Sequence, residues 1–149
     1  APPRAFAAAG LPPGSAQHVL MNPPFNDAAV LPASPHAGRA RAHAADAGLL
    51  PAWVAAANRL LAGNGDLTMI WRADGLTQVL NALRGFGGIA MRPVHPRADA
   101  AAMRILLRAV KGSRAPMRLL PGLVLNDAQG RPSPAAEAIL RDALALPLA

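Results

Sequence analysis

The sequence predicts an α/β fold in which parallel strands are followed by an antiparallel hairpin. Two short apolar stretches, 18–21 and 67–71, are each followed by a segment with helical periodicity, an alternation typical of βα units and a parallel sheet. Two later apolar stretches, 89–95 and 103–110, are joined by a connector too short for a crossover helix, so we expect an antiparallel hairpin at one sheet edge. The 149 residues, 52% of them hydrophobic, are the size of one domain with an ample core.

The first predicted strand, 18–21, is apolar on both faces, as a buried parallel strand should be. It ends at two consecutive prolines, because proline has no N–H to donate to a strand ladder. A long loop rich in Pro, Ser, Gly and His is expected to reach about Arg41. Residues 42–62 then carry Leu, Ala and Trp at helical spacing, which predicts a helix with Pro51 as a candidate break.

The rest of the chain predicts shorter elements. The second strand should lead into a helix capped by Asp74 or Thr77. After the hairpin, the apolar stretch 119–125 predicts one more strand, and 134–146 predicts a terminal helix capped by Ser133. The order of elements therefore favours a parallel core sheet that is extended by later strands.

The composition excludes several kinds of site. The chain has no cysteine, which rules out disulfides, thiolate zinc sites and a cysteine nucleophile, and fits a cytoplasmic protein. His36, His43 and His95 are too scattered to form a metal site. No stretch approaches the roughly 18 to 20 apolar residues that a membrane-spanning helix needs. We therefore expect a soluble protein with no metal and no membrane partner.

The net charge of +7 is concentrated in one part of the sequence. Residues 92–118 hold seven basic residues and one acidic residue, and an overall bias toward Arg does not explain this clustering. Clustered cations favour nucleic-acid backbones through counterion release, with an ordinary solvated face as the alternative. The candidates for phosphate contacts are Lys111, Arg114 and Arg118 in this region, and Arg39 and Arg41 on the loop that follows the first strand.

The tetrapeptide Asn22-Pro23-Pro24-Phe25 follows the first strand directly, at the carboxyl end where open α/β sheets bind ligands. The prolines stiffen this turn, so the Asn22 side-chain oxygen and a backbone carbonyl can act as paired acceptors. Such a pair suits an aromatic NH2 group, because accepting both hydrogens directs the nitrogen lone pair toward an electrophilic methyl group. Phe25 would offer a stacking face to a base flipped out of its helix. A Pro-Pro turn with a buried Phe is the structural alternative.

At this 22–25 motif the chain resembles the amino-methyltransferase branch of the class I S-adenosylmethionine-dependent methyltransferases. In that branch the fourth strand of a Rossmann-like sheet ends in Asn or Asp, Pro, Pro and an aromatic residue, and all four positions match. A longer likeness covers most of residues 15–126 and points to the bacterial tRNA1(Val) adenine-N6 methyltransferases. The segments that carry it are 18–27, 53–62, 66–74, 93–97 and 111–116.

The resemblance implies S-adenosyl-L-methionine as cofactor and tRNA or another structured RNA as partner. It also implies that Asn22 and the backbone of Pro24 bind the adenine amine, that Pro23 shapes the turn and that Phe25 stacks on the base. Ribosomal guanine-N2, DNA adenine and protein glutamine methyltransferases share the tetrapeptide, so ribosomal RNA or DNA is an alternative substrate. A non-enzymatic basic RNA-binding or structural module is the alternative outside the enzymes.

The likeness is to the carboxyl-terminal half of those enzymes. The glycine-rich loop and the acidic residue with which the family binds its cofactor are absent, and the glycines within 85–88 follow a helix, as a helix stop does. We therefore expect residues 1–149 to be a single partial methyltransferase domain that lacks the cofactor-binding half, binds S-adenosyl-L-methionine weakly or not at all, and is inactive alone. A second copy could cover the edge of strand 18–21, which predicts a homo-oligomer.

Overall fold

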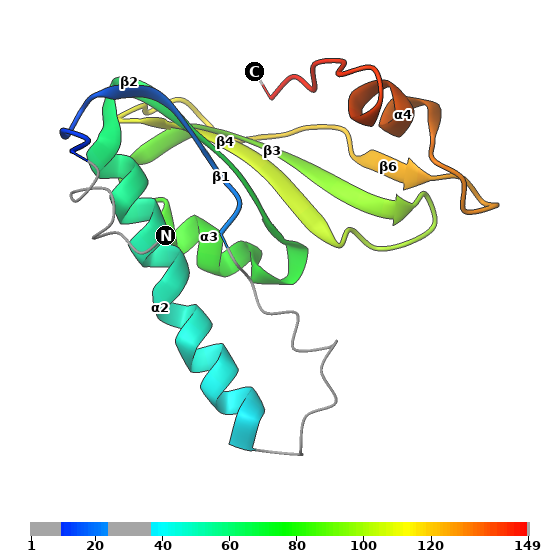
Figure 1. Ribbon diagram of the computed structural model, residues 1–149, viewed down its shortest axis with the longest axis horizontal. Helices are drawn as coiled ribbons and strands as arrows, with labels where there is room; N and C mark the ends of the chain where they lie inside the picture. The colour runs from blue at the N-terminus through cyan, green and yellow to red at the C-terminus, as the bar shows by residue number, and fades with distance from the viewer. Residues whose placement is uncertain (1–9, 24–36, 149) are drawn as a thin grey trace.

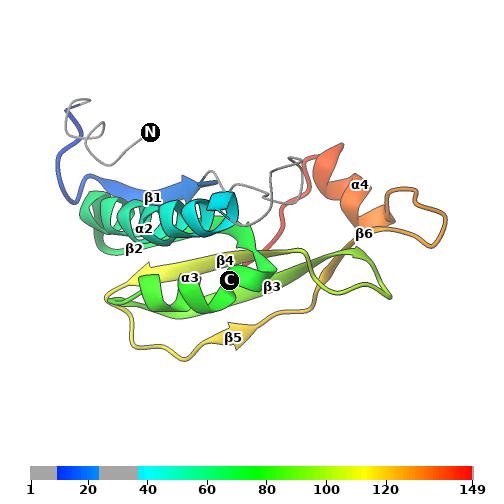
Figure 2. The same cartoon turned by 90° about the horizontal axis from the view of Figure 1, so that it is seen from below.

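The computed structural model describes residues 10–23 and 37–148, and within 37–47 it describes the backbone alone. The described residues form a six-stranded mixed sheet with helices packed on it. Its elements in chain order are β1 (Ala16–Met21), α2 (Ala37–Leu60), β2 (Leu61–Arg72), η1 (Ala73–Gly75), α3 (Leu76–Ala82), β3 (Phe86–Arg97), β4 (Arg104–Lys111), β5 (Arg118–Leu119), β6 (Leu123–Asn126) and α4 (Pro134–Leu140). Helices α2 and α3 lie on one face of the sheet, and α4 lies beside β6 (Figures 1 and 2).

The strand order is β1-β2-β4-β3-β5, with β6 also paired to β3. Strands β1 and β2 are parallel, with Met21 opposite Met69, and β4 runs antiparallel to both β2 and β3. The predicted parallel pair and the predicted hairpin are therefore confirmed. The hairpin does not form the sheet edge, because β4 is inserted between β2 and β3 and because β5 and β6 continue the sheet beyond β3.

The core lies between the sheet and the two helices. Alternate residues of β2 and β4 face α2 and α3, as the two-residue period of a strand requires. Helices α2 and α3 pack apolar side chains against this face of the sheet. The buried residues include Leu67, Met69, Trp71 and Leu107 from the strands and Leu50, Val54, Val79 and Leu83 from the helices and the C-cap of α3.

Helix α2 begins at Ala37, so the prediction of a loop as far as Arg41 is wrong. The first turns are rich in alanine, which has the highest helix propensity. Pro51 does not end the helix. Leu50 and Val54 on either side of it are 1% and 2% exposed, so packing against the sheet holds the turn that proline weakens.

Other boundaries also differ from the sequence prediction; β2, for example, begins at Leu61 rather than at residue 67. Asp74 and Thr77 do not cap α3, whose N-cap is Gly75 with no side-chain hydrogen bond. The strand expected at 119–125 is two short strands, β5 and β6, separated by a segment in which Pro121 has no N–H to donate to a ladder. Helix α4 ends at Leu140, soon followed by a positive φ at Ala143. Its cap is as predicted, because Ser133 Oγ accepts a hydrogen bond from the Ala136 amide.

Among the described residues, no helix is both long enough and apolar enough to cross a membrane. The architecture is a mixed α/β sheet in which β1, β2 and β3 share one direction. Their carboxyl ends therefore meet at one edge of the sheet, which we call the carboxyl edge. Their amino ends meet at the opposite edge, the amino edge.

Candidate functional site

Asn22 lies at the carboxyl edge, directly after β1. The preceding residue, Met21, is 6% exposed and belongs to the core, whereas Asn22 is exposed and Pro23 is buried again. The buried proline on one side and the buried methionine on the other fix the backbone, so the Asn22 amide is presented at the surface. Pro24 and Phe25 lie outside the described residues, and their roles as backbone acceptor and stacking face stay predictions.

The neighbouring strand β2 ends in an ion pair. Arg72 Nε donates to Asp74 Oδ1 at 2.8 Å, and a second guanidinium nitrogen donates to Oδ2. This hydrogen bond, together with the positive charge of Arg72, holds the pKa of the Asp74 carboxyl below its ordinary value of 3.8. The Arg72–Asp74 ion pair is bidentate and has no net charge. It therefore places fixed polar groups at the carboxyl edge without changing the charge there.

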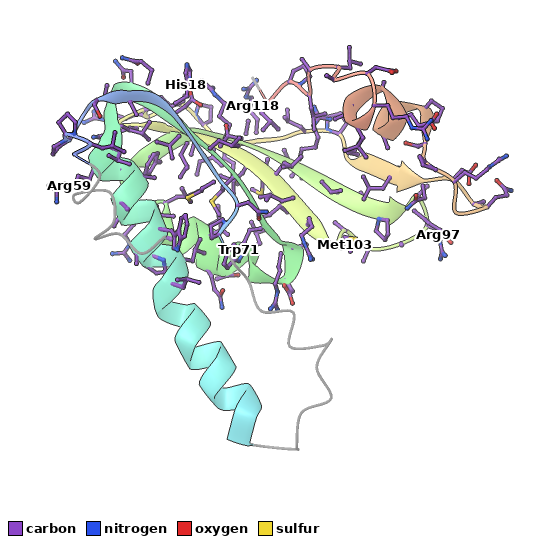
Figure 3. The ribbon with its side chains drawn as sticks, viewed as in Figure 1. His18, Arg59, Trp71, Arg97, Met103 and Arg118 are labelled. Atoms are coloured by element: carbon purple, nitrogen blue, oxygen red, sulfur yellow. The ribbon has the colours of Figure 1, made fainter. Side chains whose placement is uncertain are left out.

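The turn that carries Asp74 is fixed by close packing. A Cβ atom on Gly75 would lie 2.6 Å from Trp71 Nε1, so only glycine fits against the indole. The Ala73 amide donates to the Met103 carbonyl oxygen at 3.2 Å, which ties the turn to the start of β4. Trp71 and Met103 lie toward the same end of the sheet (Figure 3). The carboxyl edge is therefore a rigid support next to an exposed amide.

This arrangement is suited to binding and orienting a polar group. An asparagine amide offers both an acceptor and two donors, and the residues around it are held in place by packing. Among the residues that the structure describes, no three His, Cys, Asp or Glu side chains gather as a metal site would require. The Asn22 amide can hydrogen-bond to a bound partner.

Comparison with solved structures gives the fold a name. A protein from Agrobacterium tumefaciens, described as a predicted O-methyltransferase, superposes with a TM-score of 0.75 and 26% identity over 96% of this chain and 59% of that chain. This chain has a methyltransferase-like fold. No protein-family model matches the sequence, and no curated protein matches it.

Two structures of one Thermus thermophilus protein, named as a DNA modification methylase, share the methyltransferase-like fold at 18% identity. The first gives a TM-score of 0.51 over 76% of this chain and 52% of that chain. The second, complexed with S-adenosyl-L-methionine, gives 0.53 over 72% and 52%. The chain thus spans about half to three fifths of the length of these methyltransferase-like structures.

The methyltransferase-like fold separates the predicted phosphate contacts from Asn22. Lys111 ends β4 at the amino edge, and Arg114 follows it there, exposed. About five residues of strand lie between the level of Asn22 and Lys111, which is roughly 17 Å at ~3.4 Å per residue. Arg118 is exposed on β5. Arg39 and Arg41 lie in the first turns of α2 rather than on a loop; their side chains lie outside the described part.

Lys111 has internal partners. Its ammonium donates to the carbonyl oxygens of Asn58 at 2.7 Å and Leu61 at 2.6 Å. These carbonyls belong to the last turn of α2 and the start of β2, where a cation satisfies acceptors that the helix leaves open. The ammonium therefore joins two elements of the protein and is only partly available to an external phosphate.

A buried charge that the sequence did not reveal lies at the amino edge. Asp66 is 6% exposed, and its Oδ1 lies 2.6 Å from His18 Nδ1 and accepts from Arg108 at 3.3 Å. The sequence shows Asp66 only as a residue before an apolar strand, with its partners 48 and 42 residues away. Sequence spacing gives no signal for such a long-range cluster. The Arg108 guanidinium neutralises the buried Asp66 carboxylate.

Proposed function

We propose that the intact protein is an S-adenosylmethionine-dependent N6-adenine methyltransferase that acts on tRNA. The observation that supports it is the exposed Asn22 amide, placed by buried flanking residues at the carboxyl end of β1 in a methyltransferase-like fold. Open α/β sheets bind their ligands at this edge. Asn22 is followed by Pro23, Pro24 and Phe25, which complete the motif that binds and stacks an amine-bearing base.

The chain's own part in the reaction is to hold the acceptor amine. Asn22 Oδ1 accepts one hydrogen of the NH2 group and the Pro24 carbonyl accepts the other. The nitrogen lone pair is then less delocalised into the ring and points toward the methyl group to be transferred. Phe25 stacks on the base, which must leave its helix or lie in a loop. S-adenosyl-L-methionine, when bound, supplies the methyl group. We assign none of the described residues to that cofactor.

Other substrates would use the same edge. Ribosomal guanine and DNA adenine also carry exocyclic amines, and the Thermus thermophilus neighbour is named as a DNA modification methylase. The Agrobacterium tumefaciens neighbour is described as a predicted O-methyltransferase, which makes a hydroxyl acceptor a further candidate. A non-enzymatic RNA-binding or structural module is the candidate outside catalysis, and the experiment below separates all of these.

The test is mass analysis of nucleosides from cells in which the encoding gene is deleted. We expect N6-methyladenosine to fall in tRNA and to return with the wild-type gene. The Asn22→Ala gene should not restore it, whereas Asn22→Asp keeps a side-chain acceptor and should restore part of it. Loss of a modified guanine from ribosomal RNA, of N6-methyladenine from DNA or of an O-methyl group would assign the substrate differently. Unchanged nucleosides in all fractions would contradict the proposal.

We also propose that residues 1–149 by themselves bind the cofactor weakly or not at all. The family holds it with a glycine-rich loop after a strand, and the glycines around 85 instead end α3 and begin β3. Calorimetry of this chain with S-adenosyl-L-methionine should therefore show no saturable heat. Micromolar binding would contradict this.

Arg39 and Arg41, in the first turns of α2, are proposed to contact phosphates beside the flipped base.

A second copy of the chain is the proposed cover for β1. The outer edge of β1 pairs with no strand among the described residues, and Leu20 on this strand is 81% exposed. An open strand edge with an exposed leucine is a template for pairing. We therefore propose that the 149 residues associate as a homo-oligomer through this edge.

A further inference from the structure

Two groups of arginines in this chain differ in their partners. In the first group each arginine has an acidic neighbour: Arg72 with Asp74, Arg97 with Asp99, Arg131 with Asp127 and Arg141 with Glu137. In the second group, Arg59, Arg84, Arg114 and Arg118 are exposed, and their side chains make no hydrogen bond or ion pair within the described part of the chain. The second group is thus free to bind an external anion.

Three contacts bring the second group to one place. Gly112 N donates to Gly85 O at 2.9 Å, so the turn after Arg84 meets the turn before Arg114. Gly88 N donates to Ala115 O at 2.9 Å, which fixes the segment next to Arg114 against β3. The Lys111 ammonium joins the same turn to the last residues of α2, where Arg59 lies exposed.

Arg118 extends this group along β3. It lies on β5 opposite Ala90 of β3. Arg59 lies toward one end of the molecule and Arg97 toward the other, with Arg118 between them (Figure 3). We call the set Arg59, Arg84, Arg114 and Arg118 the four-arginine edge.

Acidic side chains do not compensate this charge. Among the described side chains at the amino edge the acid is Asp66, which is 6% exposed and already contacts Arg108 and His18. The other acids whose side chains are described lie at the carboxyl edge or near α4. An uncompensated cluster of cations produces a positive potential that attracts polyanions.

We propose that the four-arginine edge binds the phosphate backbone of a structured nucleic acid, with Arg59, Arg84 and Arg114 at the opposite end of the sheet from Asn22. A guanidinium binds phosphate through two parallel hydrogen bonds, which suits arginine to this contact. Arg59, Arg84 and Arg114 lie near the level of Lys111, roughly 17 Å along the strands from the level of Asn22, a span of about five nucleotides along one strand of a duplex. Arg118 is level with Leu20 and is separated from β1 by the width of the sheet instead. The proposal rests on the proposed function for the base at Asn22, and adds that the substrate is a polynucleotide reaching both ends.

The test compares two variants with equal loss of charge. Arg59→Ala/Arg84→Ala/Arg114→Ala removes three residues of the edge, whereas Arg97→Ala/Arg131→Ala/Arg141→Ala removes three arginines that have acidic partners. Binding of a labelled tRNA transcript is measured over a series of salt concentrations. The slope of log affinity against log salt should fall by about two to three for the first variant, since each phosphate contact contributes ~0.7 to 0.9. The control should change it by less than about one.

Two outcomes would overturn this proposal. The first is an equal change of slope in both variants, which would reflect net charge alone. The second is competition by polyglutamate as effective as that by RNA of the same charge, which would indicate an acidic protein partner. Thermal melting of each variant checks that it is folded.

Asn22→Ala separates the two hypotheses, because it should leave tRNA affinity and salt slope unchanged. Failure of the nucleoside test with a reduced slope in the edge variant would reject the proposed function and keep the backbone surface. If the wild-type gene restores the modified nucleoside but the edge variant leaves the salt slope unchanged, the proposed function stands and the backbone surface is rejected.

Discussion

Lys111 Nζ lies 2.6 Å from the carbonyl oxygen of Leu61, so the last residue of β4 is bonded to the first residue of β2 across 50 residues of sequence. The same ammonium bonds to Asn58 O in the last turn of α2. A lysine that the sequence presents as part of a basic turn is therefore a connection between a helix and two strands.

Replacing Lys111 with methionine should lower the free energy of unfolding by about 2 to 3 kcal/mol, because two backbone carbonyls lose a charged donor. Urea denaturation measures this. The matched control is Arg114→Met, an exposed position without a partner in the described part of the chain, which should change stability by less than about 0.5 kcal/mol. Equal stabilities of the two variants would show that the Lys111 bonds contribute nothing.

Gly75→Ala should destabilise the protein by about 1 to 3 kcal/mol, because the new methyl group would overpack the Trp71 indole. Its Cβ would lie 2.6 Å from Nε1 and 2.9 Å from Cδ1. Thermal unfolding gives the stability, and the tryptophan emission spectrum reports the displaced ring. Gly63→Ala, which meets nothing within 4 Å, is the control and should unfold like the wild type. A normal melting curve for the Gly75 variant would contradict the packing.

The Arg72–Asp74 pair should stabilise the protein in a pH-dependent way. Because the folded pKa of Asp74 is lowered from 3.8, the stabilisation is present above that value and is lost as the pH falls through the folded pKa. The Asp74 side chain is 66% exposed, so screening limits the loss in Asp74→Asn to about 0.5 kcal/mol at neutral pH. Urea unfolding at neutral and acid pH should show this difference vanish in acid. A carboxyl titration by NMR with a midpoint above 3.8 would refute it.

Leu20→Lys should convert the proposed homo-oligomer to a monomer, since a charged side chain on an open strand opposes pairing. Light scattering should then give 15.3 kDa. Leu140→Lys changes a leucine of similar exposure, 77% against 81%, on α4, and should leave the assembly intact. A wild-type chain that is already monomeric at high concentration would rule out association through β1.

The sequence predicts the elements that depend on local pattern. The apolar runs at β1 and β2, the hairpin of β3 and β4 and the Ser133 cap are each visible in a few consecutive residues. The prediction of a buried first strand is wrong, because β1 is an edge strand and Leu20 is 81% exposed. The role of Asn22, like the cytoplasmic location, stays a prediction.

Long-range contacts explain what the sequence does not show. Residues 92–118 form one basic cluster in the sequence, but β4 carries Arg104 to the carboxyl edge and Lys111 to the amino edge. Strand direction therefore divides the cluster between the two ends of the sheet. Arg59 and Arg84, distant in sequence, join the second half because α2 and α3 both end at the amino edge.

The central position of β4 sets the order in which the sheet can be completed. Strand β3 pairs with β4, β5 and β6, all of which follow it in the sequence. During synthesis β1 and β2 can pair early, but β3 has no neighbouring strand until residues 104–111 have left the ribosome. The arrival of β4 then joins both parts at once, so assembly should be cooperative, and a nascent chain stalled before residue 104 should expose β3 to aggregation.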